Sequence, residues 1–197
     1  MSMFAALVNY SNKHKGLILV SIVFISVSFA LGSIPSETLI AYVGTDNAFL
    51  LMFVLGTIGG LTTFTGLPYH LVLMSFAAGG INPFFLGICT AAGVIIGDST
   101  MFCISKRVSS SLPPKIAHFF ESIVFLVDRY PRLFVIILFL YGALSPFSND
   151  FIIASLSIAG YSYTRIIIPL AIGNICFNIS IAFIGLYAYD SLIQFFT

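Results

Sequence analysis

Two apolar segments of this chain are each interrupted, by a proline and several polar residues, before they are long enough to span a bilayer. The interruptions are residues 62–70 (TTFTGLPYH) and 145–150 (SPFSND). Residues 48–61, which precede the first one, would make roughly 21 Å of helix, against a hydrocarbon core of about 30 Å. Interrupted backbone at membrane depth is tolerated only where protein buries it or where it lines a wet cavity. The pair of interruptions therefore predicts a transporter-like site where two hairpins meet.

The composition places the chain in a membrane. Of its 197 residues 59% are hydrophobic and only 8% are charged, which is too little charge for the surface of a water-soluble domain. A net charge of +1 gives no reason to expect a nucleic acid as partner. The three cysteines lie in apolar segments without CxxC spacing, so we expect no disulfide framework, no metal site and no cofactor.

These observations predict an all-α integral membrane protein with a single membrane domain. Its expected parts are an N-terminal transmembrane helix at residues 16–33, a hairpin plus transmembrane helix at 48–105, an amphipathic interfacial helix at 113–129, and a second hairpin plus transmembrane helix at 133–188. The first segment follows Lys13 and Lys15, a pattern that signal peptides share. Cleavage near Gly32 is therefore an alternative to a first transmembrane helix.

The charge distribution predicts an orientation. If the N-terminus is cytoplasmic and each hairpin enters and leaves on one side, every lysine and arginine falls on the cytoplasmic side, as the positive-inside rule requires. Residues 33–47 then form an outer loop, and residues 84–105 and 166–187 cross the membrane. Pairs of short spanning helices would satisfy the same rule, so the charges leave these and re-entrant hairpins open.

The two units carry prolines, glycines and small residues at similar spacing, which predicts an inverted repeat. The matching positions are Pro68 with Pro146, Ala78-Gly79 with Ala159-Gly160, Gly93 with Gly173, and Gly97-Asp98 with Phe177-Asn178. Because the first unit starts outside and the second inside, a pseudo-two-fold axis in the membrane plane would relate them. The hairpin tips would then meet near mid-depth.

Polar residues at and near the tips are the candidates for a substrate or proton pathway. His70 and Asp150 are the ionisable residues at the tips, and we expect them within reach of each other. Asp98 lies too deep in its helix to be a surface charge, and such a residue indicates function unless it only makes one interhelical hydrogen bond. The full set is Pro68, Tyr69, His70, Asp98, Arg107, Pro146, Ser148, Asn149, Asp150, Arg165 and Asn174.

Each candidate also has a structural interpretation. His70 and Asp150 are also explained as helix caps. Arg107 and Arg165 would hold a lipid phosphate or merely anchor the topology. Asn174 and Asn178, at i and i+4, are expected to bond neighbouring helices.

Residues 66–107 and then 145–188 resemble the DedA or SNARE-associated (VTT domain) membrane proteins. The resemblance rests on a loop proline at Pro68, the Ala78-Gly79 step, a GxxxGD run from Gly93 to Asp98, and Lys106-Arg107. It implies opposed re-entrant hairpins in a bacterial inner membrane, and transport of lipids such as polyprenyl phosphates or phospholipids, with proton coupling in bacterial members.

The chain departs from the family pattern in both loops. It has Tyr69-His70 where bacterial flippases carry an acid, and it lacks their arginine in the second loop. Glu37 is an alternative for the missing acid. The lost arginine removes a bidentate phosphate clamp and puts polyprenyl-phosphate specificity in question.

Our first hypothesis is a lipid flippase or scramblase, in which a phosphate-bearing headgroup crosses a polar furrow between the hairpins. The expected partners are membrane lipids, with protons as coupling ion and a homo-oligomer left open. The alternative is a secondary transporter or channel for a small solute or ion. An enzyme is not expected, because the sequence has no HExxH motif or similar catalytic set. An assembly factor without transport activity is the remaining class.

Overall fold

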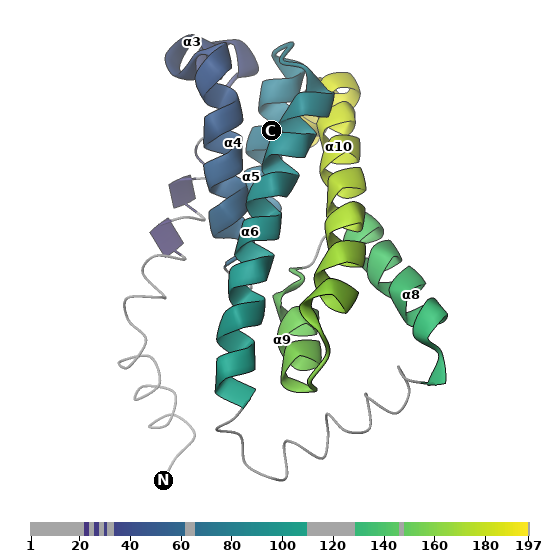
Figure 1. The fold of residues 1–197 in the computed structure, drawn as a ribbon. Helices are drawn as coiled ribbons and strands as arrows, with labels where there is room; N and C mark the ends of the chain where they lie inside the picture. Colours follow the sequence, from purple (N-terminus) through teal and green to yellow (C-terminus); the bar gives the residue numbers. More distant parts are fainter. Residues whose placement is uncertain are drawn as a thin grey trace, which may run out of the picture.

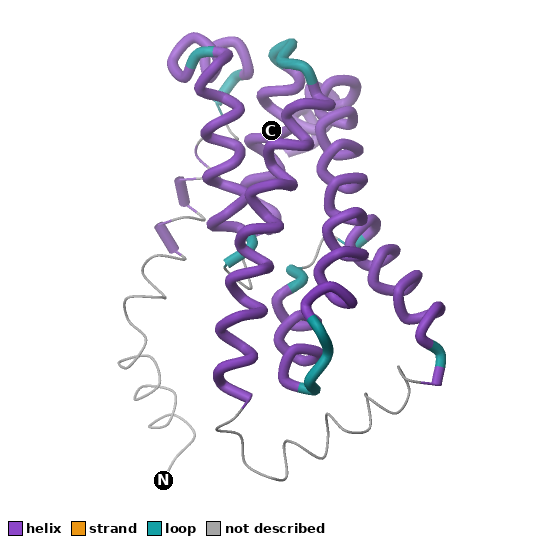
Figure 2. Tube along the Cα trace, viewed as in Figure 1, coloured by secondary structure: helices purple, strands orange, loops and turns teal. Residues whose placement is uncertain are grey.

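The computed structural model describes residues 22–23, 26–27, 30, 34–61, 66–109, 129–145 and 148–196. Throughout this part of the chain the elements are helices joined by short connections, without a strand (Figure 2). The expected N-terminal helix at 16–33 is therefore described only at five positions, all of them helical. The expected interfacial helix at 113–129 and the loop residue Pro146 lie outside the described residues, apart from residue 129.

Seven helices have described bounds in the part of the chain that the structure covers. They are α3 (Ser36–Val43), α4 (Thr45–Gly59), α5 (Gly66–Ala78), α6 (Pro83–Ser109), α8 (Pro131–Leu144), α9 (Asp150–Ile158) and α10 (Tyr163–Phe196) in the described part of the chain. Two stretches are long and apolar enough to cross a membrane, Pro83–Arg107 and Tyr163–Ala188. A third span results if α3 and α4, which meet at 97°, count as one. The chain is thus an all-helical membrane protein, as the composition predicted.

Besides α3, which has 8 residues, four of the described helices are too short to cross a bilayer alone. The longest of these four, α4, has 15 residues, and the shortest, α9, has 9. They reach roughly 22 Å and 14 Å, below the about 30 Å of a hydrocarbon core. In Figure 1, α4 and α5 lie beside the upper half of the long helices, and α8 and α9 lie beside the lower half. The lengths agree with the prediction of two interrupted hairpins.

The helix boundaries correct the sequence prediction at two places. The helix α5 begins at Gly66, so Tyr69 and His70 lie inside its first turns rather than in the interruption. Residues 33–47, expected as an outer loop, contain the helix α3, which Pro35 precedes and whose Leu39 is buried. A two-turn helix gives too short an apolar pattern to distinguish it from a loop. The second interruption lies where it was expected, between Leu144 and Asp150.

The long helices α6 and α10 pack against each other, and each carries one short helix from its own half and one from the other. On α6 these are α4 and α9, and on α10 they are α8 and α5. Buried apolar residues form two clusters, one around α4 and α5, with Met52 and Phe76, and one around α8 and α9, with Leu138 and Ile153. The pocket described below lies between these halves.

The crossing of α4 with α6 and the crossing of α8 with α10 use corresponding glycines. A side chain at Gly93 would collide with the carbonyl oxygen of Phe53 on α4, and one at Gly173 would collide with that of Phe139 on α8. In the reverse direction, Gly56 approaches the backbone of Thr90, and Gly142 that of Leu170. Small residues let membrane helices approach closely, and here they do so at positions that correspond in the two halves.

The short helices α5 and α9 end in the same hydrogen-bonded turn. The N–H of Ile81 donates to the carbonyl of Phe76, and that of Tyr161 to the carbonyl of Leu156. Gly80 and Gly160 both have φ of 91°. This left-handed conformation ends helices readily only where the residue is glycine. The two similar turns are thus 80 residues apart, with Gly80 in the place of Gly160, whereas the sequence matched Ala78-Gly79 with Ala159-Gly160 at a spacing of 81 residues.

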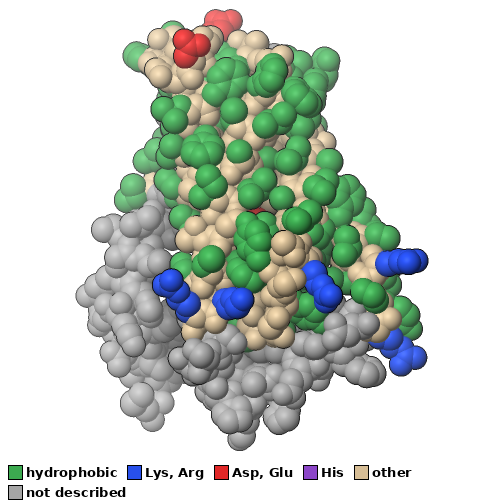
Figure 3. Space-filling view, in the orientation of Figure 1, with side chains coloured by type: hydrophobic (Ala, Val, Ile, Leu, Met, Phe, Trp, Pro, Cys, Tyr) green, Lys and Arg blue, Asp and Glu red, His purple; other side chains and the backbone are tan. Residues whose placement is uncertain are grey.

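Basic side chains gather at one end of the molecule and acidic side chains at the other (Figure 3). The described basic residues Lys106, Arg107, Arg129, Arg132 and Arg165 are exposed at helix ends, whereas the exposed Glu37 and Asp46 belong to the first turns of α3 and α4. Between the two ends the visible surface is mainly hydrophobic. This banding is what a membrane-embedded protein presents to lipid and to the two aqueous sides.

Candidate functional site

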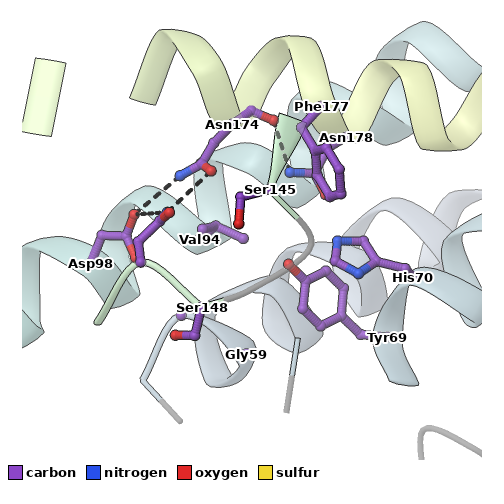
Figure 4. A pocket seen from close by; sticks show the side chains of 12 residues that line it. Gly59, Tyr69, His70, Val94, Asp98, Ser145, Ser148, Asn174, Phe177 and Asn178 are labelled. Atoms are coloured by element: carbon purple, nitrogen blue, oxygen red, sulfur yellow. Dashed lines mark hydrogen bonds between the residues drawn. The ribbon is translucent and has the colours of Figure 1, made fainter. Parts of the chain in front are cut away.

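A small polar pocket lies where the two short-helix pairs meet the two long helices (Figure 4). Its water-accessible volume is about 30 Å³. A single water needs roughly 10–15 Å³ on this measure, so the pocket holds about two waters or one small ion. Its described lining consists of Gly59, Gly60, Tyr69, His70, Val94, Asp98, Ser145, Ser148, Asn149, Asn174, Phe177 and Asn178.

Asp98 of α6 is the charged residue at the centre of a buried hydrogen-bond network. Its Oδ2 accepts one bond from the amide of Asn149, at 3.0 Å, and one from the amide of Asn174, at 3.1 Å. The same Asn149 amide also donates to Asn174 Oδ1, at 3.1 Å. Asp98 is only 2% exposed. The network joins α6, α10 and the loop before α9, so Asp98 makes more than the single interhelical bond of its structural interpretation.

The side chain of Asn178 behaves differently from its predicted role. Its Nδ2 donates to the carbonyl of Asn174, at 2.8 Å, one turn earlier in the same helix. Its Oδ1 is buried and has no hydrogen-bond partner in the described part of the chain. Asn174 therefore bonds a neighbouring helix as expected, whereas Asn178 does not and presents an oxygen to the pocket.

Tyr69 and His70 of α5 form the opposite wall. Tyr69 fits because Gly59, at the end of α4, has no side chain where the tyrosine ring lies. Its hydroxyl points into the pocket in Figure 4. The His70 ring packs on the Tyr69 ring, with centroids 4.1 Å apart, and meets the edge of Phe177 at 5.3 Å. Both side chains are buried.

At the second tip, Ser148 contacts the start of α9. The Ser148 hydroxyl accepts the backbone N–H of Asp150 at 3.3 Å, and its carbonyl accepts the hydroxyl of Tyr141 at 3.2 Å. Asp150 is the first residue of α9 and is 1% exposed. The capping role of the Asp150 side chain stays a prediction.

The pocket brings together six of the predicted site residues and leaves others elsewhere. Those that line it are Tyr69, His70, Asp98, Ser148, Asn149 and Asn174. Asp150 is buried but does not line it, so only one of the two expected tip residues does. Arg107 and Arg165 are exposed at helix ends, and Glu37 is exposed on α3. Pro68 belongs to the first turn of α5, which begins at Gly66, and its side chain is not among those that the structure describes.

The sequence did not lead us to predict some of the residues that line the pocket. Phe177, Val94 and the Gly59-Gly60 pair line the pocket, but they are ordinary residues of apolar helices. Ser145 belonged to the interruption without being singled out. The helical spacing of Val94 and Phe177 from Asp98 and Asn174 is the signal that could have found them, because residues three and four apart share a helix face.

The carboxylate of Asp98 gives the pocket a preference for a positive charge or a proton, and no lysine or arginine is found among its described lining residues. The helix ends at the pocket oppose one another. The helices α4 and α8 end there, at Gly59 and beside Ser145, and α5 and α9 begin there, near Tyr69 and at Asn149. Carbonyls at helix C-termini attract cations, and N–H groups at helix N-termini attract anions. The same region holds no group of three histidine, cysteine or acidic residues, as far as the described residues extend, that could hold a metal ion.

Comparison with known proteins adds nothing to this geometry, because no family model, no curated protein and no solved structure matches the chain.

Proposed function

We propose that the protein is a membrane transporter of the flippase or scramblase kind, which moves a phosphate-bearing lipid headgroup between two re-entrant hairpins. The observation that carries the proposal is the buried polar pocket, formed by both hairpin tips and both long helices and centred on Asp98. An ionisable side chain at this depth is costly and is retained mainly at substrate, ion or proton pathways.

The proposal includes an inverted repeat of α4–α6 and α8–α10. It is supported by the matching turns at Gly80 and Gly160 and by the matching close approaches of Gly93 and Gly173. With this spacing of 80 residues, Asp98 corresponds to Asn178, and both line the pocket. Transporter sites commonly lie on such a pseudo-two-fold axis.

The size and charge of the pocket suggest how transport proceeds. A volume of about 30 Å³ is too small for a phosphate headgroup, so the hairpins have to separate for passage. An anionic headgroup would be repelled by Asp98, because no basic side chain is found in the described lining. We therefore propose that a proton on Asp98 accompanies the headgroup, since neutralising a buried carboxylate removes both the repulsion and its desolvation cost.

The resemblance to DedA and VTT-domain proteins points to the same activity. It adds the proposal that the protein lies in a bacterial inner membrane, with a cytoplasmic N-terminus and with the basic end of the molecule inside. Because the arginine of the family's second loop is absent, a phospholipid is a better substrate proposal than a polyprenyl phosphate.

A transporter or channel for a small cation is the second candidate. The specific observation in its favour is the same small volume, which suits an ion with one water. The oxygens of Asp98 and Asn178 would suit such an ion. Neither candidate is an enzyme.

Reconstitution in liposomes with fluorescent phospholipids tests the proposal. We expect lipid movement above that of empty vesicles, and at least a tenfold loss in Asp98→Asn, which keeps the shape but not the titratable group. Asp46→Asn, an exposed acid on α4, is the matched control and should move lipid normally. Cation uptake without lipid movement would support the second candidate instead.

A further inference from the structure

A second cavity opens on the lipid-facing side of the molecule, between α8 and α10. It has a volume of about 270 Å³ and an entirely apolar lining. Four of its side chains are about half exposed, at 44% for Val135, 53% for Ile136, 52% for Ile168 and 51% for Ile172. Phe139 and Pro169 complete the lining. We call this surface the α8–α10 groove.

Two arginines lie one helical turn beyond the groove, one on each helix. Arg132 precedes Val135 and Ile136 by three and four residues on α8, and Arg165 precedes Ile168 and Pro169 by the same spacing on α10. Residues three and four apart share a helix face. Each arginine therefore extends the stripe that forms one wall of the groove, and both are exposed.

These arginines lie at the level of the membrane where lipid headgroups lie. They belong to the basic end of the molecule (Figure 3), where the positive-inside rule puts the cytoplasmic surface. The apolar groove runs from this level toward the middle of the membrane. Basic pockets between transmembrane helices on the cytoplasmic side are suited to anionic headgroups.

We propose that the α8–α10 groove binds one anionic phospholipid of the inner leaflet, with its phosphate between Arg132 and Arg165 and an acyl chain in the groove. Arginine offers paired N–H donors that match phosphate oxygens. A zwitterionic phospholipid would fill the apolar part equally well but would gain less from two positive charges. The site uses none of the residues that line the polar pocket, so it stands whether or not the protein moves lipids.

Lipid binding to the purified full-length chain tests the site. Native mass spectrometry would compare dioleoyl phosphatidylglycerol with dioleoyl phosphatidylcholine, which differ in headgroup charge but not in acyl chains. We expect phosphatidylglycerol to bind more tightly, and its affinity to fall about 30-fold in the double variant R132Q/R165Q, from roughly 1 kcal/mol per arginine. Lys106→Gln, a charge loss of the same size on α6, should leave binding unchanged.

A separate variant tests the part of the site that would bind the acyl chain. Ile136→Phe combined with Ile172→Phe would fill the groove and should weaken the binding of both lipids, with no loss of fold because both positions are half exposed. Equal binding of phosphatidylglycerol to wild type and R132Q/R165Q would overturn the proposal. So would displacement of the lipid by millimolar inorganic phosphate alone, or an oligomer of the wild type that the groove-filling variant does not form.

Lipid binding in the groove can be tested separately from the proposed transport activity. Asp98→Asn should bind phosphatidylglycerol normally while failing to move lipid. Normal lipid movement by R132Q/R165Q without tight phosphatidylglycerol binding would show that the groove is not a loading site. Tight binding with no lipid movement in the wild type would leave the groove intact and remove the proposed function.

Discussion

Asp98 is held so that one of its oxygens is engaged and the other is left for exchange. Both amide bonds, from Asn149 and Asn174, fall on Oδ2, and Oδ1 takes no part in them. Amide donors compensate part of the cost of burying a carboxylate without neutralising it. A proton or small cation at Oδ1 would complete the neutralisation. The two asparagines thus fix the orientation of the acid, and under the proposed function its charge is left to the transported species.

A double-mutant cycle measures how strongly Asp98 and Asn149 interact. We expect Asn149→Ala to lower the free energy of unfolding by about 0.6–1.7 kcal/mol, the range for hydrogen bonds between membrane helices. In an Asp98→Ala background the same change should cost less, because only the bond from Asn149 to Asn174 then remains to be lost. Unfolding in mixed micelles, followed by circular dichroism, gives these values.

The control for this cycle is Asn47→Ala. Asn47 is exposed, and among the described residues its side chain donates only to the carbonyl of Val43, four residues earlier at the end of α3, so its loss should change stability little. A cost of Asn149→Ala that is the same with and without Asp98 would mean that the bond between them contributes nothing to stability.

At the scale of elements, the helix pairs are fixed by close backbone approach rather than by shaped side chains. Gly93 and Gly173 meet the backbones of α4 and α8, which cannot move aside as a side chain would. Methyl groups at these two positions should therefore push apart two corresponding helix pairs.

Gly93→Ala and Gly173→Ala should each destabilise the protein by roughly 1–3 kcal/mol, the usual cost of overpacking. Ile96→Ala, on the exposed side of α6, is the control and should cost less. Thermal unfolding in detergent measures all three. If only one of the two glycine substitutions lowers the stability, the two helix crossings are not equivalent, and the inverted repeat is contradicted.

The sequence allowed the breaks, the long helices and the buried acid to be predicted, because polar residues and prolines stand out in an apolar run. Asp98, Asn149 and Asn174 were found in this way. It did not allow helix rotation to be predicted, since α5, α6 and α10 are apolar on all sides and give no periodic pattern to orient them. For this reason the inward positions of Phe177 and Val94 were missed, and Asp150 was expected in a pocket that it does not line.

At the scale of the whole molecule, the polar pocket and the α8–α10 groove occupy different depths. The groove adjoins the basic end, whereas the pocket lies where the short helices of both halves end. A lipid held at the arginines would therefore have to move toward the centre of the membrane to reach Asp98. This order of sites requires the basic end to be cytoplasmic and the hairpin tips to be buried.

Cysteine labelling in intact cells tests that topology. The native Cys89, Cys103 and Cys176 are free and can be replaced by alanine before single cysteines are introduced. With a membrane-impermeant maleimide we expect Asp46→Cys to react from outside, and Arg132→Cys to react only after the membrane is permeabilised. Leu61→Cys, at the end of α4, should react slowly from both sides, because a re-entrant tip lies near mid-depth. Rapid labelling of Leu61→Cys from the cytoplasmic side alone would mean that α4 and α5 are a pair of short spanning helices.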